Sequence, residues 1–344
     1  MKWTRQAAWP PDGTDTILVI GGKEMKKLAL IVAVCVMVLA VGNVGAGENK
    51  IPPRNGKNYV IGTVLISGTN PHCQIFEASF RQTVKSYGAE PVVLDADYDP
   101  AKLMSCISDL IAQDVDGIVV EACDAEAPVT GIAEAHRTGI ITTATDMLVN
   151  VKQEDGILLS MTGTDNYSAG LQLGQDFVKR ANGKQMNYLI MDMKTNSSAV
   201  QRVEGFLAAV KGHDNLKLLD QQQPVPETQE QKMALMDAWV QQFDKIDCVF
   251  AFHDPAAIAC IQSLEAANRL KGTLIYSVDG NQDAIKAIAD GRMTATAKQQ
   301  PDQLAAQPVH DIFKAIRGEP LGHDWLQLLP IIYIDQSNAT KYLD

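Results

Sequence analysis

Three polar residues that are each followed by proline mark predicted helix starts in this sequence. They are Asn70-Pro71, Asp99-Pro100 and Asp254-Pro255. The side-chain oxygen of such a residue can cap free backbone amides, and proline fits the first turn because its missing N–H costs nothing there. In an open parallel sheet, ligands bind beyond the carboxyl ends of the strands, where such helices begin. We therefore expect Asn70 and Asp254 either to contact a ligand or to act only as helix caps.

A candidate nucleophile lies in the first of these regions. Cys73 is near a predicted helix N-terminus, where the pKa of a thiol can be lowered, and His72 or His253 could act as its base. Nothing in the sequence positions that base, however, and the motifs GxGxxG, GxxxxGK[ST] and GxSxG are absent. The histidines show no HxxxH or HExxH spacing. We therefore expect no enzyme, no cofactor and no metal site.

Short β-branched runs alternate with helical patterns in the first half of the chain. The runs are Tyr59–Ile61, Pro91–Leu94, Gly117–Val120 and Ile140–Thr142. The gaps between them hold amphipathic helical patterns, the clearest of which lies between the second and third runs. This rhythm predicts a parallel sheet with helices on both faces.

A second series of the same kind begins after Gly163. Its predicted strands are Asn187–Met191, Cys248–Phe252 and Leu274–Val278. The chain then ends with a predicted helix, Pro301–Gly318, and a predicted strand, Leu329–Asp335, which could return to the first lobe and then the second. The sequence therefore predicts an α/β fold with two doubly wound parallel-sheet lobes.

Length and charge limit the classes of function. A chain of 344 residues normally folds as two domains, and the hydrophobic share of 46% is that of a globular protein. A net charge of −11 without a local basic patch repels phosphate backbones. We therefore expect no nucleic-acid partner.

The N-terminal residues 1–46 have the pattern of an export signal. Met25-Lys26-Lys27 precedes the apolar run Leu28–Val41, and Val44–Ala46 supplies the small residues of a cleavage site. The run is shorter than the roughly 20 residues that span a bilayer. We expect translation to start at Met25, so that residues 1–24 are an upstream leader, and cleavage to follow Ala46. The mature chain would keep five cysteines, an odd number that leaves at least one free thiol.

Seven short motifs follow one another in the order of a known family. They are Val64–Phe76 with its Asn-Pro step, Thr145-Asp146, Thr164–Asn166, Arg202–Phe206, Phe252–Asp254, Val278–Gly280 and Gln299–Asp302. Together they resemble the type I periplasmic solute-binding proteins of the ribose-binding family, from about Asn58 to the end. The resemblance implies a cleft between two lobes joined by a three-strand hinge near Gly163, Gln299 and Leu326. It assigns residues 58–163 and 299–326 to the N-terminal lobe, and residues 164–298 and 327–344 to the C-terminal lobe.

The same resemblance implies a set of ligand contacts. Asn70 and Asp146 would belong to the first lobe, Arg202 and Asp279 to the second, and Gln299 to the hinge. Their chemistry suits a sugar, because a carboxylate can accept hydrogen bonds from two adjacent hydroxyls and a guanidinium can donate to two.

Several positions depart from the family pattern, and we expect them to shape the ligand. His72 and Cys73 stand where relatives have an aromatic pair, and Met147 stands where they have arginine. His253 replaces an asparagine, and the loop at Glu227 lacks the expected aromatic residue. These departures argue against ribose itself and leave open another monosaccharide, a polyol, an acidic sugar or a different polar solute.

The function that the resemblance implies is capture of a solute in the periplasm for the membrane subunits of an ABC importer, by a monomer. A chemoreceptor or sensor kinase could also bind the same protein as its partner. A sugar-responsive repressor shares the fold, but it needs a DNA-binding segment where this chain has the export signal.

Overall fold

The computed structural model describes residues 56–343, which belong to one compact unit. The predicted leader and signal peptide, residues 1–46, lie outside the described residues. Within residues 56–343, no helix is long and apolar enough to cross a lipid bilayer. The five cysteines of this part of the chain all carry free thiols.

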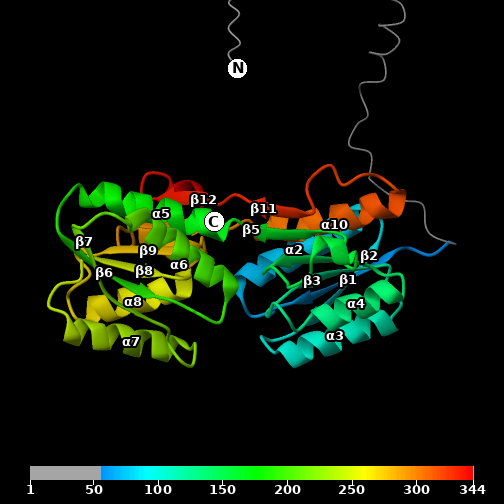
Figure 1. Cartoon of the computed structure of the whole chain (residues 1–344), viewed down its shortest axis with the longest axis horizontal. Helices are drawn as coiled ribbons and strands as arrows, with labels where there is room; N and C mark the ends of the chain where they lie inside the picture. The colour runs from blue at the N-terminus through cyan, green and yellow to red at the C-terminus, as the bar shows by residue number, and fades with distance from the viewer. Residues whose placement is uncertain (1–55, 344) are drawn as a thin grey trace, which may run out of the picture. The chain divides into compact units, whose positions relative to one another are not determined.

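The first lobe is a six-stranded sheet between two helical layers (Figure 1). Its strand order is β11-β5-β4-β3-β1-β2, and every neighbouring pair is parallel. The strands are β1 (Val60–Leu65), β2 (Glu90–Asp95), β3 (Gly117–Glu121), β4 (Ile141–Asp146), β5 (Met161–Thr164) and β11 (Leu326–Leu329). Helices α2 (Pro71–Ser86) and α10 (Pro301–Arg317) pack on one face, and α3 (Pro100–Ala112) and α4 (Val129–Arg137) pack on the other. The lobe also holds the short 3-10 helix η1 (Gln153–Asp155).

The second lobe repeats this plan with one antiparallel strand. Its order is β12-β10-β9-β8-β6-β7, and β12 runs antiparallel to β10. The strands are β6 (Met186–Met191), β7 (Leu216–Gln222), β8 (Cys248–Ala251), β9 (Leu274–Asp279), β10 (Ala295–Lys298) and β12 (Ile332–Asp335). Helices α5 (Asn166–Ala181) and α6 (Ser197–Val210) cover one face, whereas α7 (Gln229–Gln242), α8 (Asp254–Ala266) and α9 (Gln282–Ala289) cover the other. The 3-10 helix η2 (Ala339–Lys341) follows β12.

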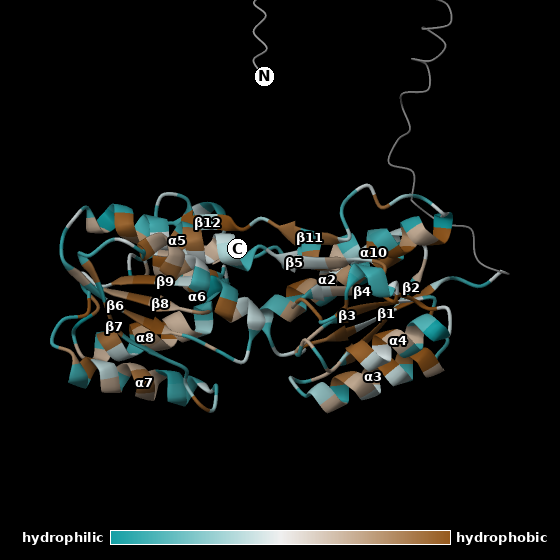
Figure 2. Cartoon of the chain, viewed as in Figure 1, coloured by the Kyte–Doolittle hydropathy of each residue, from teal (hydrophilic) through white to brown (hydrophobic). Residues whose placement is uncertain are grey.

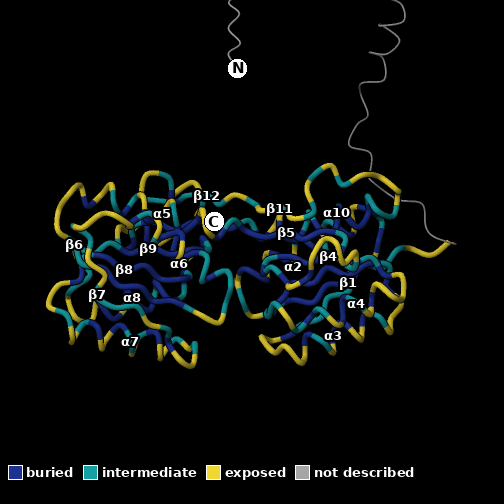
Figure 3. Tube along the Cα trace, viewed as in Figure 1, coloured by how far each residue is buried: buried dark blue, intermediate teal, exposed yellow. Residues whose placement is uncertain are grey.

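Each sheet face is buried against its helices by an apolar cluster, which gives four clusters in the described residues. The inner strands such as β3 and β8 are therefore buried on both faces, as parallel sheets require, whereas the edge strands β7 and β11 keep exposed positions. Figure 2 shows helices that are apolar on one side and polar on the other. Figure 3 shows the resulting pattern, with buried strands inside and exposed positions along the outer sides of the helices. The predicted α/β fold with two doubly wound lobes is confirmed.

Three connections join the two sheets. The chain passes from β5 to α5, from β10 to α10 and from β11 to β12. The predicted final strand, Leu329–Asp335, is present in the second lobe as β12, but it begins only at Ile332. The prediction missed β11, which Pro330 separates from β12 and which lies in the other sheet. Proline cannot donate a ladder hydrogen bond, so it suits the point where the strand leaves one sheet for the other. The last crossover therefore follows Leu329, a little later than the predicted position near Leu326.

Helices α5 and α6 lie side by side (Figure 1), and they approach each other at glycines. A Cβ atom at Gly170 would lie 1.8 Å from the Arg202 carbonyl oxygen, and one at Gly205 would lie 2.0 Å from the Tyr167 carbonyl oxygen. Neither position can hold a larger residue without moving the helices apart. This close contact fixes the position of α6, the helix that carries Arg202.

Candidate functional site

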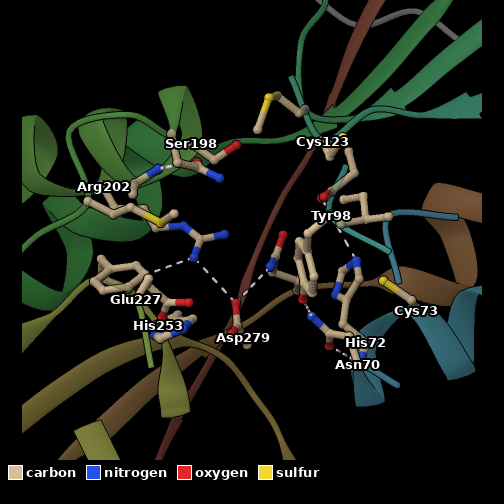
Figure 4. A pocket seen from close by; sticks show the side chains of 18 residues that line it. Asn70, His72, Cys73, Tyr98, Cys123, Ser198, Arg202, Glu227, His253 and Asp279 are labelled. Atoms are coloured by element: carbon tan, nitrogen blue, oxygen red, sulfur yellow. Dashed lines mark hydrogen bonds and ion pairs between the residues drawn. The ribbon is translucent and has the colours of Figure 1, made fainter. Parts of the chain in front are cut away.

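A pocket of about 500 Å³ lies at the carboxyl ends of the strands and is lined by both lobes. This volume is within the range of about 300–1,000 Å³ that is typical of small-molecule sites. Figure 4 shows Arg202, His253 and Asp279 on one side of the pocket and Asn70, His72 and Tyr98 on the other.

The structure brings together ten of the eleven residues that the sequence singles out. The pocket lining includes Asn70, His72, Cys73, Asp146, Met147, Arg202, Glu227, His253, Asp279 and Gln299. The exception is Asp254, which does not reach the pocket.

Asn70 is both a helix cap and a pocket residue. Its Oδ1 accepts a hydrogen bond from the His72 backbone N–H at 2.9 Å, which caps α2 as predicted. Its Nδ2 donates to the Tyr98 hydroxyl at 2.7 Å. Burial raises the pKa of Tyr98 to about 12, so the hydroxyl stays neutral. Asn70 therefore positions a phenol ring at the pocket wall.

Asp146 ends β4 with a left-handed backbone φ of +66°. Aspartate tolerates this conformation better than most residues, and it turns the side chain out of the strand. The carboxylate Oδ1 lies 3.8 Å from His72 Nε2, a distance that suits an ion pair when the histidine is protonated. This pair forms the polar part of the first-lobe side.

Cys73 lies behind His72 and contacts an acidic residue that the sequence did not single out. Its thiol donates to Glu121 Oε1 at 3.4 Å, and Glu121, at the end of β3, is completely buried. Burial first, and the negative charge of Glu121 second, raise the pKa of Cys73 well above its usual range. The burial of this thiol and its hydrogen bond to Glu121 therefore argue against the alternative of a nucleophilic thiolate at a helix N-terminus.

Glu121 is itself perturbed by its surroundings. Burial, and then the charge of Asp146, raise its pKa to about 8, while the Ile66 N–H donates to Oε2 at 3.0 Å and opposes this shift. His72 Nε2 lies 4.0 Å from Glu121 Oε1. His72, Glu121 and Asp146 thus offer three potential metal-ligand atoms within 4.8 Å of one another, although the sequence predicts no metal site.

Arg202 is buried on the second-lobe side and is 6% exposed. Its Nε–H donates to Asn166 Oδ1 at 2.8 Å, and its Nη1 donates to the Phe252 carbonyl at 2.9 Å and to Asp279 Oδ1 at 3.3 Å. The two N–H groups on Nη2 have no hydrogen-bond partner among residues 56–343. A planar guanidinium held in this way has two donors left for a ligand.

Asp279 and Gln299 link the second lobe to the crossover region. Asp279 Oδ1 accepts from Gln299 Nε2 at 2.9 Å, and Gln299 Oε1 accepts from the Thr164 hydroxyl at 2.7 Å. Thr164 ends β5, and Gln299 follows β10, so the chain of hydrogen bonds joins two of the three crossovers. Asp279 has a φ of +137°, and such a conformation costs roughly 1–3 kcal/mol and occurs preferentially at functional sites.

Glu227 is paired within the second lobe. It forms an ion pair with Lys232, and its Oε1 lies 3.1 Å from His253 Nε2. His253 Nδ1 accepts the Ala256 N–H at the start of α8, so the ring proton of the neutral histidine is on Nε2 and points to Glu227. Burial alone would raise the pKa of Glu227, but the hydrogen bonds from His253 and Lys232 lower it. Glu227 is therefore a paired anion at the pocket edge.

The prediction of a ligand-reading role for Asp254 is wrong. The cap of α8 is His253, whose backbone is extended, and Asp254 is the first helical residue and is completely buried. Its carboxylate accepts hydrogen bonds from the Ser277 hydroxyl, from Thr296 Oγ1 at 2.8 Å and from the Asn281 N–H at 2.7 Å. Asp254 therefore supports the loop behind Asp279 instead of facing the pocket.

Several pocket residues were not singled out as ligand contacts from the sequence. They are Ile66, Tyr98, Cys123, Met193, Asn196, Ser198, Ala199 and Phe252. Most of them lie in loops or at element ends, where periodicity carries no information. Glu121 had a usable signal, because it is an acidic residue directly after an apolar strand run.

Two α/β lobes that line one pocket with the carboxyl ends of their strands define a two-lobed solute-binding protein. The family of the periplasmic binding protein domain matches residues 61–320, and the chain belongs to this family. The matching relatives are solute-binding proteins and not enzymes.

Individual relatives cover more than four fifths of this chain. The ribose import binding protein RbsB of Haemophilus influenzae is 26% identical over 296 residues, which are 86% of this chain and 95% of the relative. A periplasmic solute-binding protein from Actinobacillus succinogenes, solved with bound D-allose, has a TM-score of 0.77 and 21% identity over 83% of this chain and 100% of its own. A solute-binding protein from Bacillus halodurans, solved with bound myo-inositol, has a TM-score of 0.74 and 20% identity over 86% of this chain and 98% of its own.

Proposed function

We propose that this protein is the extracytoplasmic substrate-binding component of an ABC importer and that it captures a monosaccharide or polyol. The observation that carries this proposal is the pocket itself, where Asp146 and His72 of one lobe face the same cavity as Arg202 and Asp279 of the other. The names of the relatives, which bind ribose, D-allose and myo-inositol, support a polyhydroxylated ligand.

Hydroxyl groups match the donors and acceptors of the pocket. Each hydroxyl can donate one hydrogen bond and accept others. Adjacent hydroxyls can therefore donate hydrogen bonds to the Asp146 carboxylate and accept hydrogen bonds from Arg202 Nη2. Asn70, Asp279 and Gln299 would add contacts, although their described hydrogen bonds already use part of their capacity. Tyr98 offers an aromatic face against which the apolar side of a sugar ring could pack.

Capture would proceed by closure of the two lobes on the solute. A ligand that bridges both lobes binds the closed form more tightly and shifts the population toward it. The three crossovers would absorb the rotation. Gln299 would report on closure, because it is hydrogen-bonded to a residue of each sheet, Thr164 and Asp279.

The closed form would be the species that the membrane subunits of the importer recognise. A chemoreceptor or sensor kinase that reads the same closed form is the alternative partner. We place the protein in the periplasm as a monomer, exported through a cleavable signal peptide.

A thermal-shift screen of residues 47–344 tests the proposal, with pentoses, hexoses, polyols, sugar acids, amino acids and nucleosides as ligands. A ligand present at 100 times its Kd adds about 2.7 kcal/mol to the free energy of unfolding. For a chain of this size, the unfolding midpoint then rises by about 5 °C. We expect such a rise with one class of sugar or polyol. A rise only with amino acids or nucleosides would refute the choice of ligand, and no rise with any class would refute solute capture.

A further inference from the structure

We propose that His72, Glu121 and Asp146 form a binding site for one divalent transition-metal cation on the first-lobe side of the pocket. This inference goes beyond the capture of a sugar or polyol and does not depend on it. The three residues come from the first turn of α2 and from the ends of β3 and β4. One imidazole and two carboxylates form a donor set that suits a cation such as Zn²⁺ or Mn²⁺.

The distances fit a single ion. His72 Nε2 is 3.8 Å from Asp146 Oδ1 and 4.0 Å from Glu121 Oε1. Two bonds of about 2.0–2.2 Å to one zinc ion, at a tetrahedral angle, place their donor atoms about 3.4 Å apart. Small side-chain movements would therefore bring His72 and each carboxylate to bonding distance of one ion, and all three donor atoms already lie within 4.8 Å of one another.

The Nε2 atom of His72 gives independent evidence for a ligand at this site, because it lacks a hydrogen-bond partner in the described part of the chain. His72 is 8% exposed, and its Nε2 is buried without a hydrogen-bond partner among residues 56–343. The two nearby carboxylate oxygens lie beyond hydrogen-bonding distance. A buried polar atom normally has a partner, and an uncompensated one costs about 1–3 kcal/mol. A metal ion between Nε2 and the carboxylates would satisfy this nitrogen.

Supporting hydrogen bonds hold Glu121 in the orientation that the site needs. The Ile66 N–H donates to Oε2, and the Cys73 thiol donates to Oε1, so the carboxylate cannot rotate freely. Such supporting contacts to metal ligands are typical of metal sites, where they orient the ligands.

The charges at this point also favour a cation. Glu121 is completely buried and Asp146 is largely buried, yet no lysine or arginine of residues 56–343 forms an ion pair with either carboxylate. A cation bound between them would allow both carboxyl groups to be ionised side by side in this low-dielectric environment. Because His72 and Asp146 also line the pocket, a bound ion would present its remaining coordination positions to the solute.

The test is a calorimetric titration of the chelator-treated, solute-free protein with Zn²⁺, together with a Co²⁺ titration followed by visible absorption. We expect one equivalent of Zn²⁺ to bind and Co²⁺ to give the absorption of a coordinated ion. The variants Glu121→Gln and Asp146→Asn should each bind Zn²⁺ at least tenfold more weakly, a loss at least as large as that caused by removing a supporting group. The control is His136→Ala, which removes an exposed histidine outside the pocket and should leave binding unchanged.

Three outcomes would overturn the proposal. These are no Zn²⁺ binding, equally tight binding of Mg²⁺, and Zn²⁺ binding that survives in both carboxylate variants while circular dichroism shows that they are folded. Because solute is absent, failure here leaves the solute-capture proposal standing. Conversely, a protein that binds Zn²⁺ but no sugar or polyol would refute that proposal alone.

Discussion

Replacing Arg202 by lysine keeps the positive charge but removes the planar guanidinium group. The guanidinium donates to Asn166, Phe252 and Asp279 and keeps two N–H groups on Nη2 for the pocket. An ammonium group is a single point on a flexible stem, so it cannot occupy all of these positions together. We therefore expect Arg202→Lys to lose both protein contacts and the contact with the solute.

The loss of affinity in Arg202→Lys follows from the usual strength of the hydrogen bond that is lost. A hydrogen bond to a charged group contributes about 1.5–3 kcal/mol. The loss of one solute contact therefore predicts binding that is roughly 10- to 150-fold weaker, at about 1.4 kcal/mol per tenfold change. The free energy of unfolding should also fall, because Arg202 is buried and its partners lose their donors.

The assay is isothermal titration calorimetry with the solute that the thermal-shift screen identifies, and urea unfolding measures stability separately. Arg269→Lys is the matched control. Arg269 donates from Nη1 to the Val240 carbonyl and from Nη2 to the Phe243 carbonyl, and it does not line the pocket. That variant should lose stability and keep its affinity for the solute. A folded Arg202→Lys protein whose Kd is within twofold of the unchanged protein would refute the reasoning.

Three further predictions concern the pocket and its support. Asp146→Ala should leave the protein folded and weaken solute binding by about 2–5 kcal/mol, because it leaves buried hydroxyls of the solute without an acceptor. Unchanged affinity in calorimetry would mean that the solute binds elsewhere. Burial, and then the charge of Asp279, raise the pKa of Asp254 to about 7. The protonated carboxyl therefore contributes stability that is fully present below the pKa of the unfolded chain, and this contribution is lost as the pH rises to about 7. Urea unfolding between pH 4 and 7 should therefore give a smaller loss of stability with rising pH in Asp254→Asn, and an identical slope would contradict the assignment. Gly170→Ala should lower the free energy of unfolding by at least about 1–3 kcal/mol, because the added Cβ meets the backbone of α6. The control Gln175→Ala, on the exposed side of α5, should change the free energy of unfolding little. Equal stability of the two variants would contradict the close helix contact.

The fold was largely predictable because the strands and helices differ in period. Short apolar runs rich in β-branched residues, such as Gly117–Val120, favour buried strands, and the helical stripes between them favour a parallel sheet. The final strand was not predictable in the same way, because β11 and β12 read as one apolar run whose break depends on Pro330 and on which sheet edge is free. Whether a run belongs to one sheet or two is set by tertiary pairing, which the period does not encode.

The site was predictable where a side chain follows a strand end or a helix start. Asn70, Asp146 and Asp279 occupy such positions, and the structure brings them to one pocket with Arg202, which lies in the second turn of α6. Asp254 occupies one as well, but its side chain points inward, because the extended backbone of the preceding residue makes that residue the cap.

The acidic cluster around Glu121 could not be predicted from spacing. Its members are 49 and 25 residues apart in the sequence, as residues 72, 121 and 146, and they meet only because α2 begins, and β3 and β4 end, at the same edge of the first sheet. Local motifs such as HExxH detect ligands on one element and miss ligands that three elements supply.

The central claim is that a solute that bridges both lobes closes them. Small-angle X-ray scattering with and without the identified solute tests this claim most directly. We predict that saturating solute lowers the radius of gyration of the protein, and that the same solute concentration leaves the radius of Arg202→Lys closer to its solute-free value. A solute that binds tightly in calorimetry but leaves the radius of gyration unchanged would contradict capture by closure.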